Sequence, residues 1–196
     1  QMLASTPTFH VASWGGRGYP SVIHEMTEMA IQKFGQYDHG NQPDHHVLYL
    51  YTAAGQPWKT EYWTRRVCRD LYGSGPEGFP GDEDNGEMAC WYLLSAMGFY
   101  PLCPGRPEYV LTSPLFSKTT IDLPDGKKFI IRADKNYDQN IYVQSRSLGG
   151  IPYTNTWITQ QAITAGGELT VKLGTTPMKR IVQENELPHS MSMGRD

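Results

Sequence analysis

Residues 86–101 read Gly-Glu-Met-Ala-Cys-Trp-Tyr-Leu-Leu-Ser-Ala-Met-Gly-Phe-Tyr-Pro, and the pattern of the chain changes at their end. The apolar run before Gly98 predicts a helix over roughly residues 86–97, because glycine is common just beyond a helix C-terminus. Upstream, apolar residues at helical spacing between Pro and Gly boundaries predict further helices. These are expected from a Ser21 cap to Gly35, over residues 44–54 behind Pro43, and from Pro57 to Leu71 before Gly73.

Downstream of Tyr100 the pattern is that of strands. Asp125-Gly126 is a strong hairpin signal between residues 121–123 and 129–131. Further strands are expected at residues 109–111, 119–123, 141–143 and 169–173, with turns at Gly149-Gly150 and Gly166-Gly167. Helices followed by strands predict an α+β fold rather than alternating βαβ units. We expect helices over residues 1–100, an antiparallel sheet or sandwich over residues 101–182, and a disordered polar tail over residues 183–196.

The composition of the 196 residues excludes several classes of protein. An aromatic content of 12% with 19% charged residues argues against a disordered chain. A net charge of −3 and a pI near 6.1 give no basic surface for nucleic acid, and no apolar run is long enough to span a membrane. Three cysteines without C-x-x-C spacing indicate neither a disulfide framework nor a zinc site, and Cys68 and Cys90 are expected to be buried thiols.

The acidic loop, residues 81–87, reads Gly-Asp-Glu-Asp-Asn-Gly-Glu just ahead of the helix before Gly98. One interpretation is a solvated turn in which Asn85 caps that helix. A calcium-binding EF-hand loop fails, because the twelfth position from Asp82 is Leu93 rather than Glu. A third interpretation is catalytic: repulsion between Asp82 and Asp84 can separate their pKa values and leave one of them as a general base.

His24-Glu25 stands near the start of the first predicted helix. The sequence resembles a zinc-protease helix at first, but position 28 is Glu28 rather than His, so the second ligand is missing. The pair is then either a surface pair or a recognition element for a hydroxylated ligand. Imidazole and carboxylate together offer hydrogen bonds to a vicinal diol.

Three histidines fall within residues 39–46, which read His-Gly-Asn-Gln-Pro-Asp-His-His. His45 and His46 are adjacent, so on a helix their side chains point about 100° apart, which disfavours a mononuclear zinc site. Oxygen ligands from Asn41, Gln42 and Asp82 suit a hard cation such as calcium better.

Several motifs recur together in one family. They are Gly40-Asn41-Gln42-Pro43 with His45-His46, Tyr49-Leu50-Tyr51, Ala54-Gly55-Gln56-Pro57-Trp58-Lys59-Thr60, Gly81-Asp82-Glu83-Asp84-Asn85-Gly86, Trp91-Tyr92 and Ala96-Met97-Gly98-Phe99-Tyr100-Pro101. From about Tyr19 to about Pro177 the chain resembles the C-terminal part of the family 92 glycoside hydrolases, which are calcium-dependent exo-α-mannosidases. The resemblance implies that the helices belong to an (α/α)6 barrel.

The resemblance also implies roles for particular residues. The family inverts the anomeric carbon, and the acidic loop resembles its base loop, with Asp84 as general base and Asp82 as its carboxylate partner. Calcium would bind the 2- and 3-hydroxyls of the terminal mannose, with Asn41 and Gln42 as implied ligands. His24 and Glu25 match the pair that contacts the leaving-group mannose in members that cleave α-1,2 linkages.

Two departures from the family pattern stand out. Gln42 replaces the usual Glu and removes one negative charge from the implied calcium site. The Glu-Gly-Asn-x-Trp-Gln-Tyr type motif that carries the general acid does not occur in these 196 residues. We therefore expect a C-terminal fragment with an incomplete barrel, inactive alone, which holds the base half of a two-carboxylate mechanism.

The expected partners are a mannose-containing glycan, such as an N-glycan or yeast mannan, and the rest of the parent chain. Self-association through exposed aromatic residues is also expected. Bacterial members are often secreted or periplasmic, but the sequence leaves the compartment open. The competing hypothesis is a non-catalytic carbohydrate-binding or structural module in the β-rich half, where Tyr142, Tyr153 and Trp157 stack on sugar faces.

Overall fold

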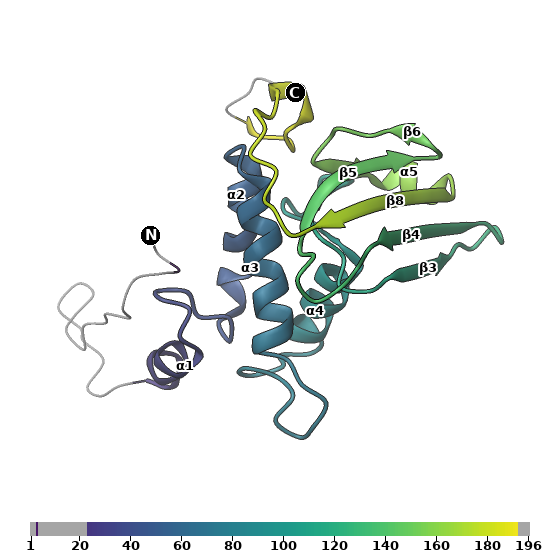
Figure 1. Cartoon of the computed structure of the whole chain (residues 1–196). Coiled ribbons are helices and arrows are strands. Elements are labelled where there is room, and N and C mark those ends of the chain that lie inside the picture. The colour runs from purple at the N-terminus through teal and green to yellow at the C-terminus, as the bar shows by residue number, and fades with distance from the viewer. Residues whose placement is uncertain (1–2, 4–22, 192–196) are drawn as a thin grey trace. The chain divides into compact units, whose positions relative to one another are not determined.

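The computed structural model describes Leu3 and residues 23–191 of the chain (Figure 1). It forms two compact units. Unit 1 comprises Gln1–His45 and Arg69–Cys90, and unit 2 comprises His46–Cys68 and Trp91–Asp196. The predicted domain boundary at residue 100 lies close to the change from helix to strand. The two compact units do not follow this boundary, because each consists of two stretches that alternate along the chain.

Unit 1 contains helix α1 (His24–Gln32) and the short 3-10 helix η2 (Gln42–Asp44). The expected Ser21 cap lies outside the described residues, and Ile23 occupies the N-cap position without a side-chain hydrogen bond. The helix ends at Gln32 because Lys33 adopts a left-handed conformation with φ of 59°, two residues earlier than predicted. None of the nine residues of α1 is fully buried, and Glu25, Glu28 and Gln32 are half-buried.

Residues 44–54 were expected to form one helix, but they form the 3-10 helix η3 (Val47–Tyr49) and the single-turn helix α2 (Leu50–Ala53). The cause is the hydroxyl of Thr60, which accepts from the backbone N–H of Thr52 at 3.1 Å and donates to the carbonyl of Leu48 at 2.9 Å. Those two backbone groups would pair with each other in a continuous α-helix. A side chain inserted between them therefore divides the segment.

Thr60 belongs to α3 (Pro57–Asp70), which starts at proline as predicted, and α4 (Glu87–Met97) precedes the strands. Two sheets follow. A three-stranded antiparallel sheet has the order β1-β2-β7, and a five-stranded sheet has the order β3-β4-β8-β5-β6. The strands are β1 (Phe99–Tyr100), β2 (Glu108–Leu111), β3 (Lys118–Asp122), β4 (Lys128–Asp134), β5 (Tyr142–Leu148), β6 (Ile151–Pro152), β7 (Trp157–Thr159) and β8 (Gly167–Gly174), with helix α5 (Gln160–Thr164) before β8.

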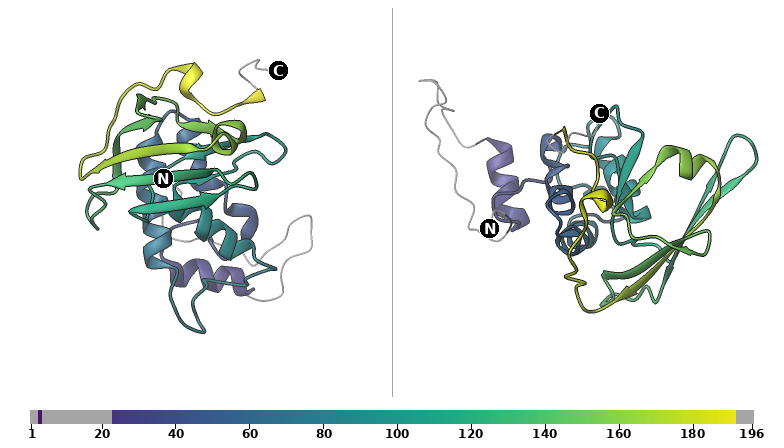
Figure 2. Two further views of the ribbon diagram at one scale, coloured as in Figure 1. Left: turned by 90° about the vertical axis from the view of Figure 1, so that its right-hand side faces the viewer. Right: turned by 90° about the horizontal axis from the view of Figure 1, so that it is seen from above.

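The β3–β4 hairpin forms around the predicted turn, where Gly126 has φ of +80°, a conformation that glycine adopts without strain. The expected antiparallel sheet forms with one exception, because β8 pairs with β4 in parallel. β8 lies between β4 and β5 and runs antiparallel to β5. Local turn signals cannot show such an insertion of a distant strand. Figure 2 shows the twist of this sheet from two further directions.

The core of unit 2 lies against the inner faces of its strands. In β4 the side chains of Phe129, Ile131 and Ala133 alternate with more exposed neighbours, as expected for a strand with one buried face. Val143, Leu169, Val171 and Leu173 belong to the same cluster, and Leu94 and Met97 of α4 pack against it. The order of helices followed by strands confirms the predicted α+β class.

The expected disordered tail is ordered over residues 183–191. Glu186 of the 3-10 helix η4 (Glu184–Glu186) accepts from Arg180 at 2.5 Å, and the backbone N–H of His189 donates to Glu108 at 2.8 Å. These contacts explain why a polar segment is held in place, and residues 192–196 lie outside the described part. The expectation for cysteines is half right, since Cys68 is buried but Cys90 is exposed.

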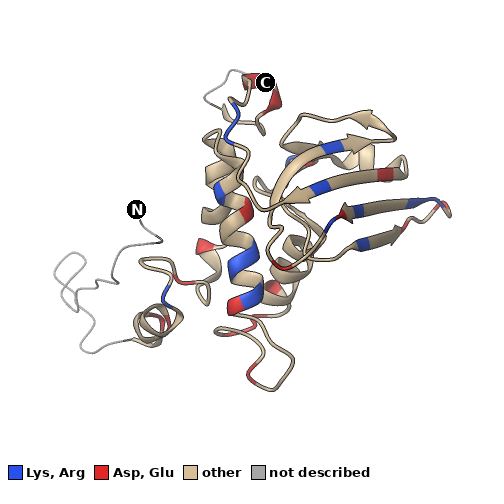
Figure 3. Cartoon of the chain, viewed as in Figure 1, with Lys and Arg blue, Asp and Glu red and all other residues tan. Residues whose placement is uncertain are grey.

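Charged residues of both signs occur along the strands of the five-stranded sheet (Figure 3). Lys128 pairs with Asp122 at 2.5 Å and Arg132 pairs with Glu168 at 3.3 Å, and all four side chains are substantially exposed. Such surface pairs contribute little to stability. Among the described residues, no helix has the length and apolar character needed to cross a membrane.

Candidate active site

The first two turns of α1 carry three polar side chains of the candidate site. The imidazole Nδ1 of His24 lies 3.4 Å from Oε2 of Glu25, and its Nε2 lies 4.0 Å from Oδ2 of Asp82 in the acidic loop. Glu28 follows His24 by one helical turn, and burial raises the pKa of its carboxyl, while the His24 imidazole opposes that rise. The fold thus brings the predicted His24-Glu25 pair to the predicted Asp82.

Two glycines allow this approach. A Cβ atom at Gly40 would lie 2.3 Å from Oε2 of Glu28 and 2.5 Å from the carbonyl oxygen of Pro80. A Cβ atom at Gly81 would lie 2.6 Å from Cα of Gly40, and Gly81 also has φ of +139°. Gly40 and Gly81 are in direct contact, so a side chain at either position would displace backbone. This contact brings the residues that follow the two glycines close together.

Gln42 makes the polar link between these two segments. Its amide Nε2 donates to the backbone carbonyl of Asp82 at 2.9 Å. A glutamate at this position has no donor for that carbonyl when ionised. This hydrogen bond therefore depends on the amide of Gln42.

The acidic loop has an unusual backbone. Asp84, Asn85 and Gly86 have consecutive positive φ values of 47°, 61° and 97°. Asp and Asn tolerate this left-handed region better than most residues, and such conformations concentrate at functional sites. Asp82 and Asp84 are exposed.

The helix cap of the acidic loop differs from the expected one. Glu83, not Asn85, accepts from the backbone N–H groups of Gly86 at 2.6 Å and Ala89 at 3.2 Å, so its carboxylate caps the start of α4. Of the loop's first three acidic residues, one is therefore structural. The side chain of Asp84 is exposed, unlike that of Glu83, which is half-buried.

A buried hydrogen-bond network supports the Asn41-Gln42 segment. The Tyr37 hydroxyl lies 2.7 Å from Nδ1 of His39, Nε2 of His39 lies 2.7 Å from the Tyr72 hydroxyl, and that hydroxyl donates to the carbonyl of Met88 at 3.2 Å. A neutral His39 with its proton on Nε2 satisfies every member of this chain. Burial lowers the pKa of His39, which favours that neutral form.

His45 and Asp38 complete the network. The rings of His39 and His45 stack at 4.7 Å between centroids, and Nε2 of His45 donates to the carbonyl of His39 at 3.1 Å. Oδ1 of Asp38 accepts from Gly40 N–H and from Gln32 at 3.1 Å each, and burial raises the pKa of Asp38 to about 6. Two of the three histidines considered as metal ligands, His39 and His45, thus have structural roles, and His46 is exposed.

Among the described residues, no group of three or more His, Cys, Asp and Glu side chains could hold a metal ion. The residues left for a cation are the amides of Asn41 and Gln42 with the carboxylate of Asp82. Because Gln42 uses its nitrogen on Asp82, its amide oxygen is the atom left to face a ligand. This donor set consists of oxygen atoms, which fits calcium in chemistry but provides fewer than the 6–8 ligands that calcium takes.

Sequence reasoning missed Glu28 and Asp38 as members of this region. Helical spacing from His24 could have indicated Glu28, which lies one turn away on the same face. Asp38 gives no such signal, because its place depends on the fold of residues 32–40. Asn41 is half-buried beside Gln42, as the sequence order requires.

The candidate site therefore combines exposed carboxylates, amide oxygens and an imidazole–carboxylate pair on segments that are distant in sequence. Carboxylates of this kind perform the acid and base steps of sugar hydrolysis, and the other groups suit hydroxyl recognition. This combination of groups suits the chemistry of a glycoside hydrolase.

Comparison with known proteins defines the family. The profile of the Glycosyl hydrolase family 92 catalytic domain matches residues 13–175. The chain is 43% identical to the family GH92 inverting mannosidase of Bacteroides thetaiotaomicron VPI-5482, with a TM-score of 0.80 and coverage of 97% of this chain and 26% of that one. This chain belongs to glycosyl hydrolase family 92.

Two further relatives agree. A family GH92 α-mannosidase from Bacteroides thetaiotaomicron is 33% identical, with a TM-score of 0.78 over 81% of this chain and 22% of its own. A secreted glycosidase of Arthroderma benhamiae is 30% identical over 159 residues, which are 79% of this chain and 20% of the relative. The chain thus spans between 20% and 26% of the length of these relatives.

Proposed function

We propose that this chain is part of an inverting exo-α-1,2-mannosidase that removes terminal mannose from N-glycans or mannan. The observation that carries the proposal is the meeting of three segments at Asp82, through the 2.9 Å hydrogen bond from Gln42 and the 4.0 Å contact with His24. The relatives described as an inverting mannosidase and an α-mannosidase support the same reaction.

In this proposal Asp84 is the general base. It removes a proton from the water that attacks the anomeric carbon, and Asp82 orients that water or adjusts the basicity of Asp84. Inversion requires the base and the general acid to stand about 6.5–9.5 Å apart, which leaves room for the water. The general acid is supplied by another part of the parent enzyme, because the chain carries no second motif suited to that role.

His24 and Glu25 are proposed to hold the leaving-group mannose. Oε2 of Glu25 is buried and has no hydrogen-bond partner within the described part of the chain. A buried acceptor of this kind is costly unless a ligand or water donates to it. A hydroxyl of the leaving sugar can donate there while the exposed imidazole of His24 contacts a neighbouring hydroxyl.

Asn41 and Gln42 are proposed as the calcium ligands contributed by this chain. Calcium, when bound, would hold the 2- and 3-hydroxyls of the terminal mannose and favour distortion of its ring. The role of Gln42 in the protein itself is to join the Asn41 segment to the acidic loop through Asp82. Its amide also makes the site one charge less negative than a carboxylate would.

The stereochemical outcome tests the proposal in the parent enzyme. Proton NMR of α-1,2-mannobiose hydrolysis, recorded before mutarotation, is expected to show β-mannose as the first product. Removal of calcium by a chelator is expected to abolish turnover, and added calcium to restore it. A first product with the α configuration would contradict the inverting mechanism, and full turnover in chelator would contradict the calcium proposal.

A further inference from the structure

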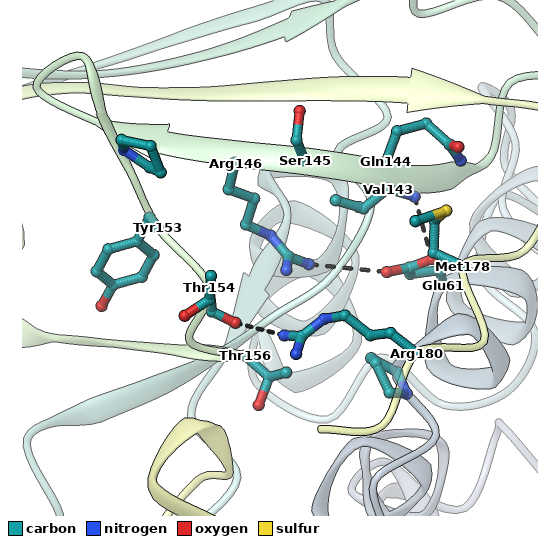
Figure 4. Close-up of a pocket in the computed structure, with 12 residues that line it drawn as sticks. Glu61, Val143, Gln144, Ser145, Arg146, Tyr153, Thr154, Thr156, Met178 and Arg180 are labelled. Carbon is teal, nitrogen blue, oxygen red and sulfur yellow. Dashed lines mark hydrogen bonds and ion pairs between the residues drawn. The ribbon is translucent and has the colours of Figure 1, made fainter. Parts of the chain in front are cut away.

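Unit 2 contains a cavity of about 220 Å³ made by residues other than those of the acidic loop. It lies between α3, β5, β6 and the segment that follows β8 (Figure 4). Its polar lining includes Glu61, Arg146, Thr154 and Arg180.

Arg146 presents unused hydrogen-bond donors in this cavity. Only 7% of its side chain is exposed, yet Nε and Nη2 have no hydrogen-bond partner within the described residues. Nη2 lies 3.7 Å from Oε1 of Glu61, which is an ion-pair distance but too long for a good hydrogen bond. Nε and Nη2 donate side by side from one edge of the guanidinium, so they match two neighbouring acceptor oxygens.

Glu61 provides the acceptor beside this pair of donors. Its Oε2 accepts from the backbone N–H of Val143 at 3.1 Å, where β5 has an irregularity between Val143 and Ser145. Oε1 remains next to Arg146 (Figure 4). The cavity therefore offers two parallel donors and an adjacent carboxylate acceptor.

The charges around the cavity are already balanced. Arg146 pairs with Glu61, and Arg180 pairs with Glu186 at 2.5 Å while donating to the carbonyl of Thr154 at 2.6 Å. An anion bound at Arg146 would bring a second negative charge close to Glu61, which is unfavourable at low dielectric constant. Hydroxyl groups avoid this conflict, because each can accept from Arg146 and donate to Glu61.

The rest of the lining suits the carbon skeleton of a sugar. Pro57, Pro152 and Met178 contribute apolar surface, and the Tyr153 hydroxyl donates to the carbonyl of Trp157 at 2.9 Å, which fixes its ring at the cavity wall. A volume of about 220 Å³ is below the range of about 300–1,000 Å³ typical of drug-sized sites. It corresponds to a single small ring.

We propose that this cavity binds one neutral monosaccharide unit, with neighbouring sugar oxygens accepting from Nε and Nη2 of Arg146 and one hydroxyl donating to Glu61. The proposal is independent of the hydrolytic function, since it uses no residue of the acidic loop.

Binding of methyl α-D-mannoside to the purified chain tests the proposal by saturation-transfer NMR and calorimetry. Arg146→Lys keeps the charge beside Glu61 but removes the parallel donors, and Met178→Trp fills the cavity from a position that is 42% exposed. Each variant is expected to weaken binding at least tenfold. Arg132→Lys, in the exposed pair with Glu168, is the matched control and is expected to bind as the wild type does.

Circular dichroism melting identifies any variant that fails to fold, and Met178→Trp keeps the test decisive if Arg146→Lys does fail. Binding must also persist in chelator and in Asp84→Asn, which separates it from the proposed active site. Absence of binding by the wild-type chain, or binding that survives both cavity variants, would overturn the proposal. Binding of D-glucuronate in preference to the neutral mannoside would also overturn it, in favour of an anion site.

Discussion

The acidic loop in unit 1 and the Glu61–Arg146 pair in unit 2 place carboxylates in opposite surroundings. The side chain of Asp82 is 78% exposed, whereas that of Glu61 is 4% exposed and burial raises its pKa to about 7. Arg146 and the Val143 N–H oppose this rise, and burial of Arg146 lowers the pKa of its guanidinium.

The difference shows how position in the fold determines what a carboxylate can do. Asp84 is exposed on a loop with left-handed backbone, where water reaches it. Glu61 has one oxygen committed to a strand irregularity and the other beside a buried cation. The first arrangement suits proton transfer, and the second suits structure and recognition.

The largest expected effect on stability comes from breaking the buried pair. Glu61→Ala leaves Arg146 buried without its carboxylate, so we expect the free energy of unfolding to fall by about 3–5 kcal/mol. Arg132→Ala removes one partner of the exposed Arg132–Glu168 pair, and we expect a loss below about 1 kcal/mol. Urea unfolding of the two variants measures both, and equal losses would remove the contrast between buried and exposed charge.

The packing of the acidic loop is tested by adding one methyl group. Gly40→Ala places Cβ 2.5 Å from the Pro80 carbonyl oxygen, and we expect unfolding free energy to fall by about 1–3 kcal/mol. In the parent enzyme kcat/KM is expected to fall as well, because the loop is displaced from Gln42. Gly73→Ala is the control, since no atom lies within 4 Å of its added Cβ. Wild-type stability and activity in Gly40→Ala would contradict the contact.

The pH dependence of the unfolding free energy gives a third test, with a smaller expected effect whose sign is fixed by the pKa of Glu61. Glu61 has its folded pKa raised from 4.5 to about 7, so the folded state holds a proton that the unfolded state has lost. Its contribution is fully present below pH 4.5 and is lost as the pH rises through about 7. Unfolding free energies of the wild type and Glu61→Gln, measured from pH 4.5 to 8, are expected to decline more steeply with pH in the wild type than in Glu61→Gln.

Other groups titrate in the same range, and the comparison with Glu61→Gln separates them. The pKa of Asp38 is raised to about 6, so its contribution to stability is lost with rising pH, as that of Glu61 is. The pKa values of His39 and His45 are lowered, so their contributions to stability are lost as the pH falls. Glu168→Gln is the control, because Arg132 lowers the pKa of Glu168 below 4.5, so this variant is expected to keep the wild-type slope between pH 4.5 and 8. An unchanged slope in Glu61→Gln would contradict the assignment.

Local signals predicted much of the fold. Asp125-Gly126 located the β3–β4 hairpin, and Pro57 marked the start of α3. The break in residues 44–54 escaped prediction because the Thr60 hydroxyl comes from the next helix. The parallel pairing of β8 with β4 depends on a strand inserted from far along the chain.

In the candidate site, too, some features follow from local sequence and others from tertiary packing. The sequence motifs singled out Asp82 and Asp84, and the structure brings His24, Gln42 and Asp82 together. The contact of Gly40 with Gly81, and the places of Glu28 and Asp38, depend on tertiary packing. The cavity at Arg146 has no local signal, because its parts come from a helix, two strands and a later segment. The assignment of Asp84 as base stays a prediction.

Turnover of α-1,2-mannobiose by the parent enzyme carrying Asp84→Asn tests that assignment most directly. Asp138→Asn, at an exposed aspartate in the β-rich part, provides the matched change elsewhere. The account predicts that kcat falls by about 10²-fold or more in Asp84→Asn and stays near the wild-type value in Asp138→Asn. Near-normal turnover in a folded Asp84→Asn enzyme would contradict it.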